Sequence, residues 1–184
     1  MSGARACARY TCRHAQCRHS LPCPALIEAF FQLIMEERYA QLSVSRVCAK
    51  ARVARSTFYI HFRNLDDLLL AHIGPQIERF AQGLQDSAKR DQVLVMVEHF
   101  WEQRRLSELW RDARFRDLFE DALQAALARN APARAAMTRH QAAGVTAVLR
   151  HWIAGRITAR PDQLAQTLIT LTSDVTTACQ TPPV

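Results

Sequence analysis

Cysteine and histidine crowd the start of the chain, and both are common zinc ligands. Four or five residues separate successive cysteines, however, whereas zinc sites usually bring ligands together through a Cys-x-x-Cys pair. We therefore expect no metal and no other cofactor. Residues 1–22 are instead predicted to be a disordered tail, or the product of a start codon placed too far upstream. The members of this cluster are Cys7, Cys12, His14, Cys17, His19 and Cys23.

Acidic residues and histidines further along the chain are of types that occur in catalytic sites, but their spacing matches no known catalytic motif. The chain has no Gly-rich phosphate loop, no His-Glu-x-x-His pair and no nucleophile elbow, and its 5 glycines offer few tight turns. Cys48 and Cys179 also lack a pattern typical of a nucleophile. We expect no enzyme. The residues considered are Glu98, His99, Glu102, Asp112, His140 and His151.

Basic residues are concentrated in one short segment. The formal charge is +7, and most of it falls on residues 1–72. From Arg38 to Asn64 the chain has basic residues but no acid. A solvated surface normally mixes both signs, whereas nucleic-acid binding requires basic groups gathered on one face. This segment is therefore the candidate nucleic-acid interface.

Apolar periodicity places this segment on short helices. Residues 24–37 have one apolar helix face, and Ser43 can cap a short helix that ends near Ala51. A connection over residues 52–54 precedes a second short helix over 55–62, in which Phe58 and Phe62 lie on one face. Two short helices across a tight turn form a helix-turn-helix.

The first turn of the second short helix carries groups that can read DNA. Arg55 can donate two hydrogen bonds to guanine, and the hydroxyls of Ser56 and Thr57 can bond bases or phosphates. Tyr59 and His61 follow with polar tips suited to the backbone. The alternative is that these are ordinary polar surface residues of a small helical domain.

The rest of the chain is predicted to be helical. Asn64 caps a longer helix that Gly74 and Pro75 interrupt, and further helices are expected over 90–109, 115–129, 132–153 and 161–179. Only residues 168–177 have the composition for a competing strand. We therefore expect an all-α protein, with a three-helix DNA-binding domain over 23–72 joined to a helical dimerisation and effector domain over 73–184.

Composition limits the class of protein. A hydrophobic fraction of 49% excludes disorder for most of the chain, and no apolar run is long enough for a membrane span. No apolar segment follows the N-terminal arginines, so we expect no secretory signal, no membrane association and a cytoplasmic protein.

Residues 26–73, LIEAFFQLIMEERYAQLSVSRVCAKARVARSTFYIHFRNLDDLLLAHI, resemble the DNA-binding domain of TetR-family regulators. STFYIHF followed by LDDLL is the most specific part, and the resemblance is greatest to the branch whose recognition helix reads R-S-T-F-Y. GVTAVLRHWIAG, further on, resembles that branch's penultimate helix. The resemblance implies a transcription regulator that binds a palindromic operator in double-stranded DNA as a homodimer. It also implies repression, the family's commonest mode, with release by a small-molecule effector.

The family's contact roles transfer to matching positions. Ser43 becomes a cap and phosphate contact, Arg55, Ser56 and Thr57 meet the bases, and Tyr59 and His61 lie near phosphates.

Three positions depart from the family pattern. Arg52 replaces the usual turn glycine, which requires a positive φ if the turn is kept; Ala54 replaces the polar cap, and Leu65 replaces a phosphate-binding lysine. Arg52 and Arg63 are candidates to replace the lost charge. These departures leave open a regulator with weakened or nonspecific DNA binding whose larger domain binds a protein partner.

The larger domain contains two further candidate sites. One is a ligand pocket and the other a dimer seam on the last two helices, with plain intrachain core as the alternative for both. The pocket candidates are Met96, His99, Phe100, Trp101, Trp110, Phe115, Phe119, Met137 and His140, and the seam candidates are Val145, Val148, Leu149, Trp152, Leu164, Leu168 and Leu171.

Overall fold

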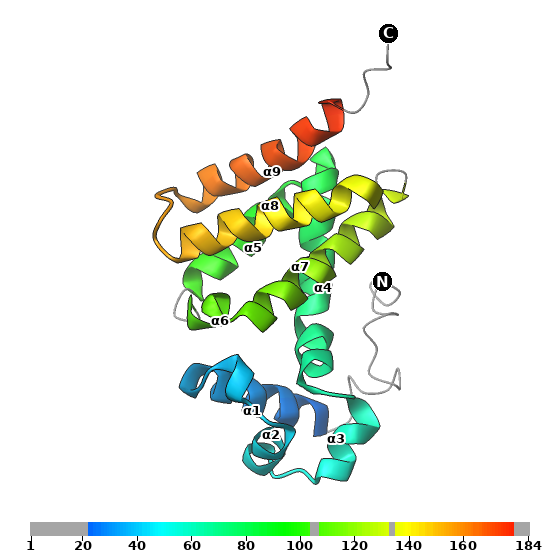
Figure 1. Cartoon of the computed structure of the whole chain (residues 1–184), viewed down its shortest axis with the longest axis vertical. Coiled ribbons are helices and arrows are strands. Elements are labelled where there is room, and N and C mark those ends of the chain that lie inside the picture. The colour runs from blue at the N-terminus through cyan, green and yellow to red at the C-terminus, as the bar shows by residue number, and fades with distance from the viewer. Residues whose placement is uncertain (1–21, 104–106, 133–134, 179–184) are drawn as a thin grey trace. The chain divides into compact units, whose positions relative to one another are not determined.

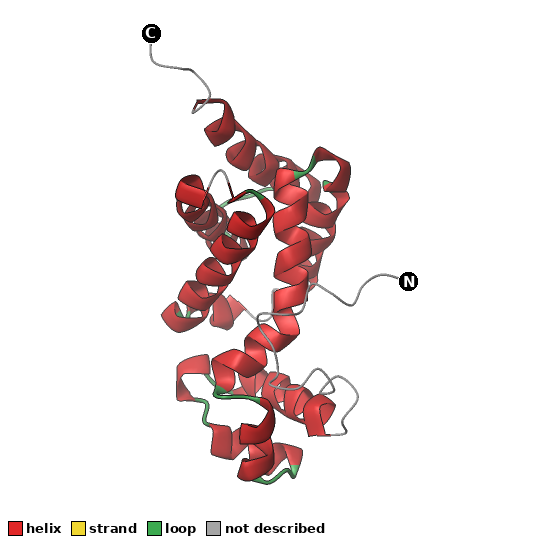
Figure 2. Ribbon diagram, turned by 90° about the vertical axis from the view of Figure 1, so that its right-hand side faces the viewer, coloured by secondary structure: helices red, strands yellow, loops and turns green. Residues whose placement is uncertain are grey.

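The computed structural model describes residues 22–103, 107–132 and 135–178, and all regular structure in these ranges is helical (Figures 1 and 2). The all-α prediction is confirmed, and residues 168–177 lie in a helix in the described part. None of the described helices is long and apolar enough to cross a membrane. The chain divides into two compact units between Pro75 and Gln76. Apart from Pro22, which begins the first helix, the predicted tail lies outside the described residues.

The N-terminal unit contains α1 (Pro22–Glu36), η2 (Tyr39–Gln41), α2 (Val44–Ala51), α3 (Arg55–His61) and the first half of α4 (Leu65–Gln85). α1 packs against both α2 and α3. The ring of Phe30 is fully buried and meets the rings of Phe31 and Tyr39 edge-on, at centroid distances of 5.5 and 6.1 Å. The predicted apolar face of α1 is buried at Leu26, Phe30 and Ile34 and half-buried at Ile27 and Phe31, while Met35 is 56% exposed.

Reciprocal hydrogen bonds cap α4 at its start. The Oδ1 atom of Asn64 accepts from the backbone N–H of Asp67 at 2.8 Å, and the Asp67 carboxylate accepts from the N–H of Arg63 at 3.0 Å. The hydroxyl of Tyr39 donates to the carboxylate of Asp66 in the same turn. The predicted cap at Asn64 is confirmed, and these bonds fix where α4 begins in the N-terminal unit.

The expected interruption of α4 at Gly74 and Pro75 is wrong, because the helix runs through both residues to Gln85. Proline lacks the N–H that would bond the carbonyl four residues earlier, so one intrahelical hydrogen bond is missing. Buried side chains on either side, including Leu69 before the proline and Phe80 after it, anchor both halves and maintain the helix.

The C-terminal unit contains the end of α4, η3 (Ser87–Lys89), α5 (Asp91–Glu102), α6 (Ser107–Arg111), α7 (Ala113–Asn130), α8 (Ala135–Ile153) and α9 (Pro161–Ala178). α7 lies along α8, while α9 packs against α5 and α8 (Figure 1). The single helix expected over 90–109 is instead two helices, since polar residues follow Phe100 and Trp101 and break the apolar period. Asp112 then caps α7 by accepting from the N–H of Phe115.

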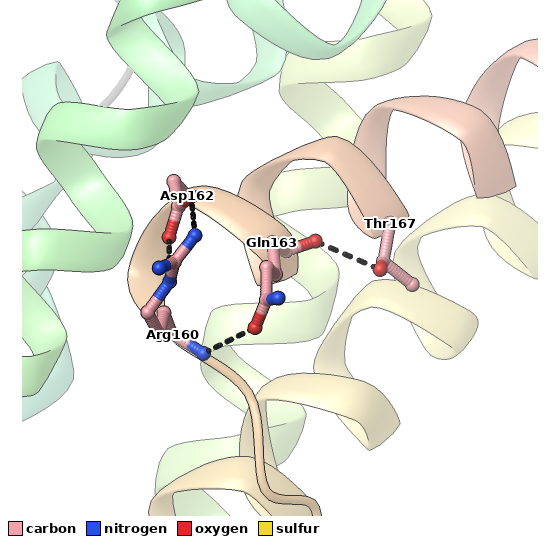
Figure 3. Close-up of polar contacts among 4 residues, drawn as sticks. All are labelled: Arg160, Asp162, Gln163 and Thr167. Carbon is pink, nitrogen blue, oxygen red and sulfur yellow. Dashed lines mark hydrogen bonds and ion pairs between the residues drawn. The ribbon is translucent and has the colours of Figure 1, made fainter.

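Polar contacts order the beginning of α9 (Figure 3). Gln163 Oε1 accepts from the N–H of Arg160 at 3.0 Å, and the Arg160 guanidinium bonds both carboxylate oxygens of Asp162 at 2.9 and 3.1 Å. These bonds from the Arg160 side chain hold the pKa of Asp162 below its usual value. Pro161 occupies the first helical position, where a missing N–H costs no intrahelical bond.

A buried threonine joins three helices of the C-terminal unit. The Thr172 hydroxyl of α9 donates to the carbonyl of Leu84 in α4 at 3.1 Å, and Gln141 of α8 donates to the Thr172 carbonyl at 2.9 Å. These hydrogen bonds compensate the cost of burying the Thr172 hydroxyl and the Gln141 amide nitrogen, whereas the Gln141 Oε1 atom is buried without a hydrogen-bond partner among the described residues. The network therefore fixes the register of α8 and α9 against the end of α4.

Candidate nucleic-acid interface

The turn between α2 and α3 is built around Arg52. This residue has φ 54° and ψ 41°, a left-handed conformation, and is the sole non-glycine with positive φ in the described ranges. The N–H of Val53 bonds the carbonyl of Cys48 at 3.0 Å, and that of Arg52 bonds the carbonyl of Ala49 at 3.2 Å. This pair of bonds is a Schellman motif, which ends α2 and reverses the chain. The positive φ predicted for Arg52 is confirmed.

Phe58 and Phe62 anchor α3 to the core. Phe58 is fully buried, Phe62 is 3% exposed, and their ring centroids lie 5.7 Å apart. Ala54, directly before the helix, makes no side-chain capping bond, as expected from the departure at this position. The fixed inner face determines which residues of α3 point outward.

The outward face of α3 consists of Arg55, Ser56, Tyr59 and Ile60, all exposed. These are two pairs at i and i+4, which stand one above the other on a helix. Thr57 and His61 are half-buried, on the border of the inner face. Thr57 is therefore less accessible to a base edge than its two predecessors in the first turn.

The other predicted contact residues surround α3. Ser43, Arg52 and Arg63 are exposed. The Ser43 oxygen accepts from the N–H of Arg46 at 3.3 Å, which confirms its role as a cap and leaves the hydroxyl proton available to a phosphate. Leu65 is 6% exposed and belongs to the core, so the position of the usual lysine contributes neither charge nor phosphate contact.

Two of the basic residues pair with acids at the end of α1, Glu36 in its last position and Glu37 directly after it. The Arg46 guanidinium lies 2.5 Å from Glu37, and the Lys50 ammonium lies 2.7 Å from Glu36. Among the described residues from 38 to 64, four arginines are exposed and form no ion pair: Arg38, Arg52, Arg55 and Arg63. Positive charge is thus available in the turn, at the start of α3 and two residues after its end.

Burial raises the pKa of the Cys48 thiol, and the positive charge of Arg55 partly opposes this shift. Cys48 is 2% exposed and therefore acts as a small core residue rather than a nucleophile.

The structure brings part of the predicted ligand pocket together. The rings of Phe100, Phe115 and Phe119 lie 5.1–5.4 Å from that of Trp110, and Met96 is also buried. His99 and His140 are exposed, and Met137 is half-buried. Trp101 is 42% exposed and stacks on Trp152 of α8 at 5.1 Å, outside this ring cluster. The four rings contact one another directly.

Most of the predicted dimer seam is buried within a single chain. Val145, Leu149, Trp152, Leu164 and Leu168 are each at most 2% exposed, and the Trp152 indole donates to the carbonyl of Ala159 at 2.8 Å. These five residues therefore belong to the intrachain core, which was the alternative to a dimer seam. Val148 and Leu171 are half-buried and remain candidates for contact with a second copy.

The cysteine-rich segment over residues 7–23 lies outside the described side chains. Among the residues that are described, no group of three or more His, Cys, Asp or Glu could hold a metal ion.

Sequence reasoning missed Ile60. Positions on α3 were predicted for Phe58 and Phe62 but none for Ile60, which is 54% exposed. Its position four residues after Ser56, and out of phase with Phe58 and Phe62, is the signal that would have placed it on the outward face.

Comparison with known proteins agrees with this geometry. Residues 26–72 match the model of bacterial regulatory proteins of the tetR family. A fatty acid metabolism regulator protein from Bacillus subtilis (strain 168) is 33% identical over 81 residues, which are 41% of this chain and 42% of that protein. The chain thus matches less than half the length of this curated relative.

Solved structures of regulators share the fold. A fatty acid degradation regulator from Bacillus halodurans superposes with a TM-score of 0.53 at 19% identity, over 83% of this chain and 95% of that one. The dihydroxyacetone kinase operon activator DhaS superposes with a TM-score of 0.51 at 20% identity, over 86% and 97%. Residues 26–72 are therefore similar in sequence to bacterial regulatory proteins of the tetR family, and the chain has the all-helical fold of these solved structures.

Proposed function

We propose that this chain is a transcriptional regulator of the TetR family that binds a palindromic operator as a homodimer. The observation that carries the proposal is the outward face of α3, where Arg55, Ser56 and Tyr59 are exposed behind a fully buried Phe58. The second helix of a helix-turn-helix enters the major groove with its N-terminal residues at the base edges. Arg55 donates to guanine, Ser56 bonds a neighbouring base or phosphate, and Tyr59 meets the backbone.

The unpaired arginines support binding to the phosphate backbone. Arg52 lies in the turn before α3 and Arg63 two residues after its end, where they replace the charge missing at Leu65. Contacts of this kind hold the protein in register on the duplex and carry no sequence information. Thr57 and His61, being half-buried, assist through their polar tips.

Dimerisation through α8 and α9 is part of the proposal. Their inner faces form the intrachain core, so the interface uses the outward residues, among them Val148 and Leu171. Within one chain, Gly144 of α8 lies against Leu171 of α9, because a Cβ there would lie 3.3 Å from Leu171 Cδ2, so Leu171 offers only its remaining surface to a second copy.

The proposed mode is repression, released by an apolar small-molecule effector. The aromatic cluster around Trp110 supports an apolar effector, as does the name of the Bacillus subtilis relative. An effector acts only if it binds the DNA-competent and DNA-incompetent states with different affinities. Since Phe100 and Phe119 contact Trp110 directly, entry of a ligand requires these rings to move apart.

Selection from a randomised duplex pool at two salt concentrations tests the proposal. We expect the purified chain to enrich a palindrome and to bind it more weakly at high salt, because each phosphate contact releases counterions. Arg55→Ala should weaken binding by about 1–3 kcal/mol and relax the base preference at one position per half-site. Arg156→Ala is the matched control, because this exposed arginine follows α8, far along the chain from the helix-turn-helix.

Two results would contradict the proposal. Retention of DNA without sequence enrichment would leave a nonspecific basic protein. Absence of binding at both salt concentrations would point to the alternative, in which the departures at Arg52, Ala54 and Leu65 have abolished DNA reading and the larger unit binds a protein partner.

A further inference from the structure

We infer that Ile60 reads the C5 methyl group of a thymine in the operator, which makes it a specificity-determining residue. The inference rests on the proposed function, since it requires α3 to enter the major groove. The juxtaposition that carries it is a side chain 54% exposed to solvent, on the same face of α3 as exposed Arg55, Ser56 and Tyr59.

The exposure of Ile60 has no role in the fold of its own unit. α3 is anchored by Phe58 and Phe62 on the opposite side, with 0% and 3% exposure. Isoleucine is also not a favourable choice for an exposed helix position, because its branched side chain loses rotamer freedom there. Ile60 places a large apolar side chain on the arginine-flanked surface that we propose faces DNA, where an apolar group of the duplex would match it.

Duplex DNA displays one such group in the major groove. Thymine carries a methyl group there, and apolar side chains distinguish thymine from the other bases by contact with it. The flanking arginines commit the surface to a polyanionic partner, and within that partner the methyl is the feature that matches isoleucine. A protein partner would have to match the arginines and Ile60 with separate residues.

Helix geometry also predicts where the thymine lies. Ser56 and Ile60 are four residues apart, a rise of about 6 Å along the helix. Successive bases on one strand are about 3.4 Å apart. With α3 lying along the strand that it reads, the thymine should therefore lie nearly two base steps from the base next to Ser56.

Uracil substitution isolates the methyl group. The probe is the duplex that the full chain enriches from the random pool, synthesised with uracil at one thymine position of both half-sites in turn. Uracil keeps all hydrogen-bonding groups of thymine and lacks only the methyl. At one position we expect the unaltered protein to lose about fourfold in affinity per half-site, the effect of removing one buried methyl group.

The variant Ile60→Ala, tested on the thymine and uracil duplexes, completes a double-mutant cycle between the side chain and the methyl group. It should bind the thymine duplex at least fourfold more weakly per half-site and show no further loss with uracil, because the contact is already gone. Val95→Ala is the matched control, since Val95 is 65% exposed on α5 of the other unit and should keep the full uracil effect. Ile60→Val should retain part of the loss in affinity that uracil causes in the unaltered protein.

The outcomes separate this inference from the proposed function. An enriched palindrome at which no thymine is sensitive to uracil would overturn the inference and leave the regulator intact, without recourse to any variant. An equal uracil effect in Ile60→Ala and the unaltered protein would also overturn it. If the pool yields no enriched sequence, the proposed function fails and the inference fails with it.

Discussion

Replacement of Arg52 by glycine should change both the stability of the protein and its affinity for DNA. Arg52 holds the left-handed conformation that ends α2, and it is also an exposed, unpaired charge next to the recognition helix. Arg52→Gly relieves the backbone and removes the charge at the same time. We therefore expect a more stable protein that binds DNA less tightly.

The size of the gain follows from the φ of 54°. A left-handed conformation costs a residue with a Cβ roughly 1–2 kcal/mol, whereas glycine adopts it freely. Glycine also gives the unfolded chain more freedom, which offsets about 0.4–1 kcal/mol. The net stabilisation should be about 0.5–1 kcal/mol, equivalent to an increase in Tm of about 1–4 °C for a chain of this size.

Two sister variants assign the effects to their causes. Arg52→Ala removes the charge and keeps the strained backbone, and Arg52→Lys keeps both. Thermal unfolding followed by circular dichroism should place only the glycine variant above the unaltered protein. In DNA binding against salt concentration, the glycine and alanine variants should both be weaker, with a log–log slope reduced by about 1 for each lost phosphate contact.

Two results would contradict these expectations, one for the backbone and one for the charge of Arg52. If Arg52→Gly is no more stable than Arg52→Ala, the left-handed conformation carries no measurable cost in this turn. If Arg52→Ala keeps the salt slope of the unaltered protein, the arginine does not contact a phosphate.

Three further predictions concern stability and reactivity. Ala54→Ser should stabilise the chain by about 1 kcal/mol in urea unfolding by supplying the missing cap of α3; an unchanged midpoint would mean that the N–H groups there are already satisfied. Gly83→Ala should destabilise it by about 1–3 kcal/mol in the same assay, because the new Cβ would lie 2.8 Å from Val93 Cγ2 and from a backbone oxygen; a neutral effect would mean that this contact relaxes freely. Cys48 should resist alkylation at pH 8 until urea is added, since burial raises its pKa and keeps it a thiol; equal labelling of native and unfolded protein in peptide mass spectrometry would contradict that.

The helix boundaries show where local sequence sufficed. The caps at Ser43 and Asn64 and the turn at Arg52 are local features, formed by hydrogen bonds between residues at most five apart, and all three were predictable. The continuation of α4 through Pro75 was not, because it depends on side chains distant in sequence that bury both halves of the helix.

The burial of the last two helices shows what local sequence could not predict. The apolar stripe that contains Leu149 and Leu168 is visible in the sequence, but periodicity gives only the direction of a face and not the surface that covers it. In the structure the two residues are fully buried inside one chain. For the same reason, the sequence could not show that His99 and His140 are exposed and lie outside the ring cluster around Trp110.

The sequence by itself determined the all-helical class, the helix-turn-helix and the excess of arginine around it, because each depends on period, capping and charge along a short stretch. Only the tertiary structure decided how far each side chain of α3 is exposed. The packing of Phe58 and Phe62 rotates the helix so that Arg55, Ser56 and Ile60 are exposed while Thr57 is half-buried. That rotation depends on contacts with α1 and α2, which no local pattern encodes.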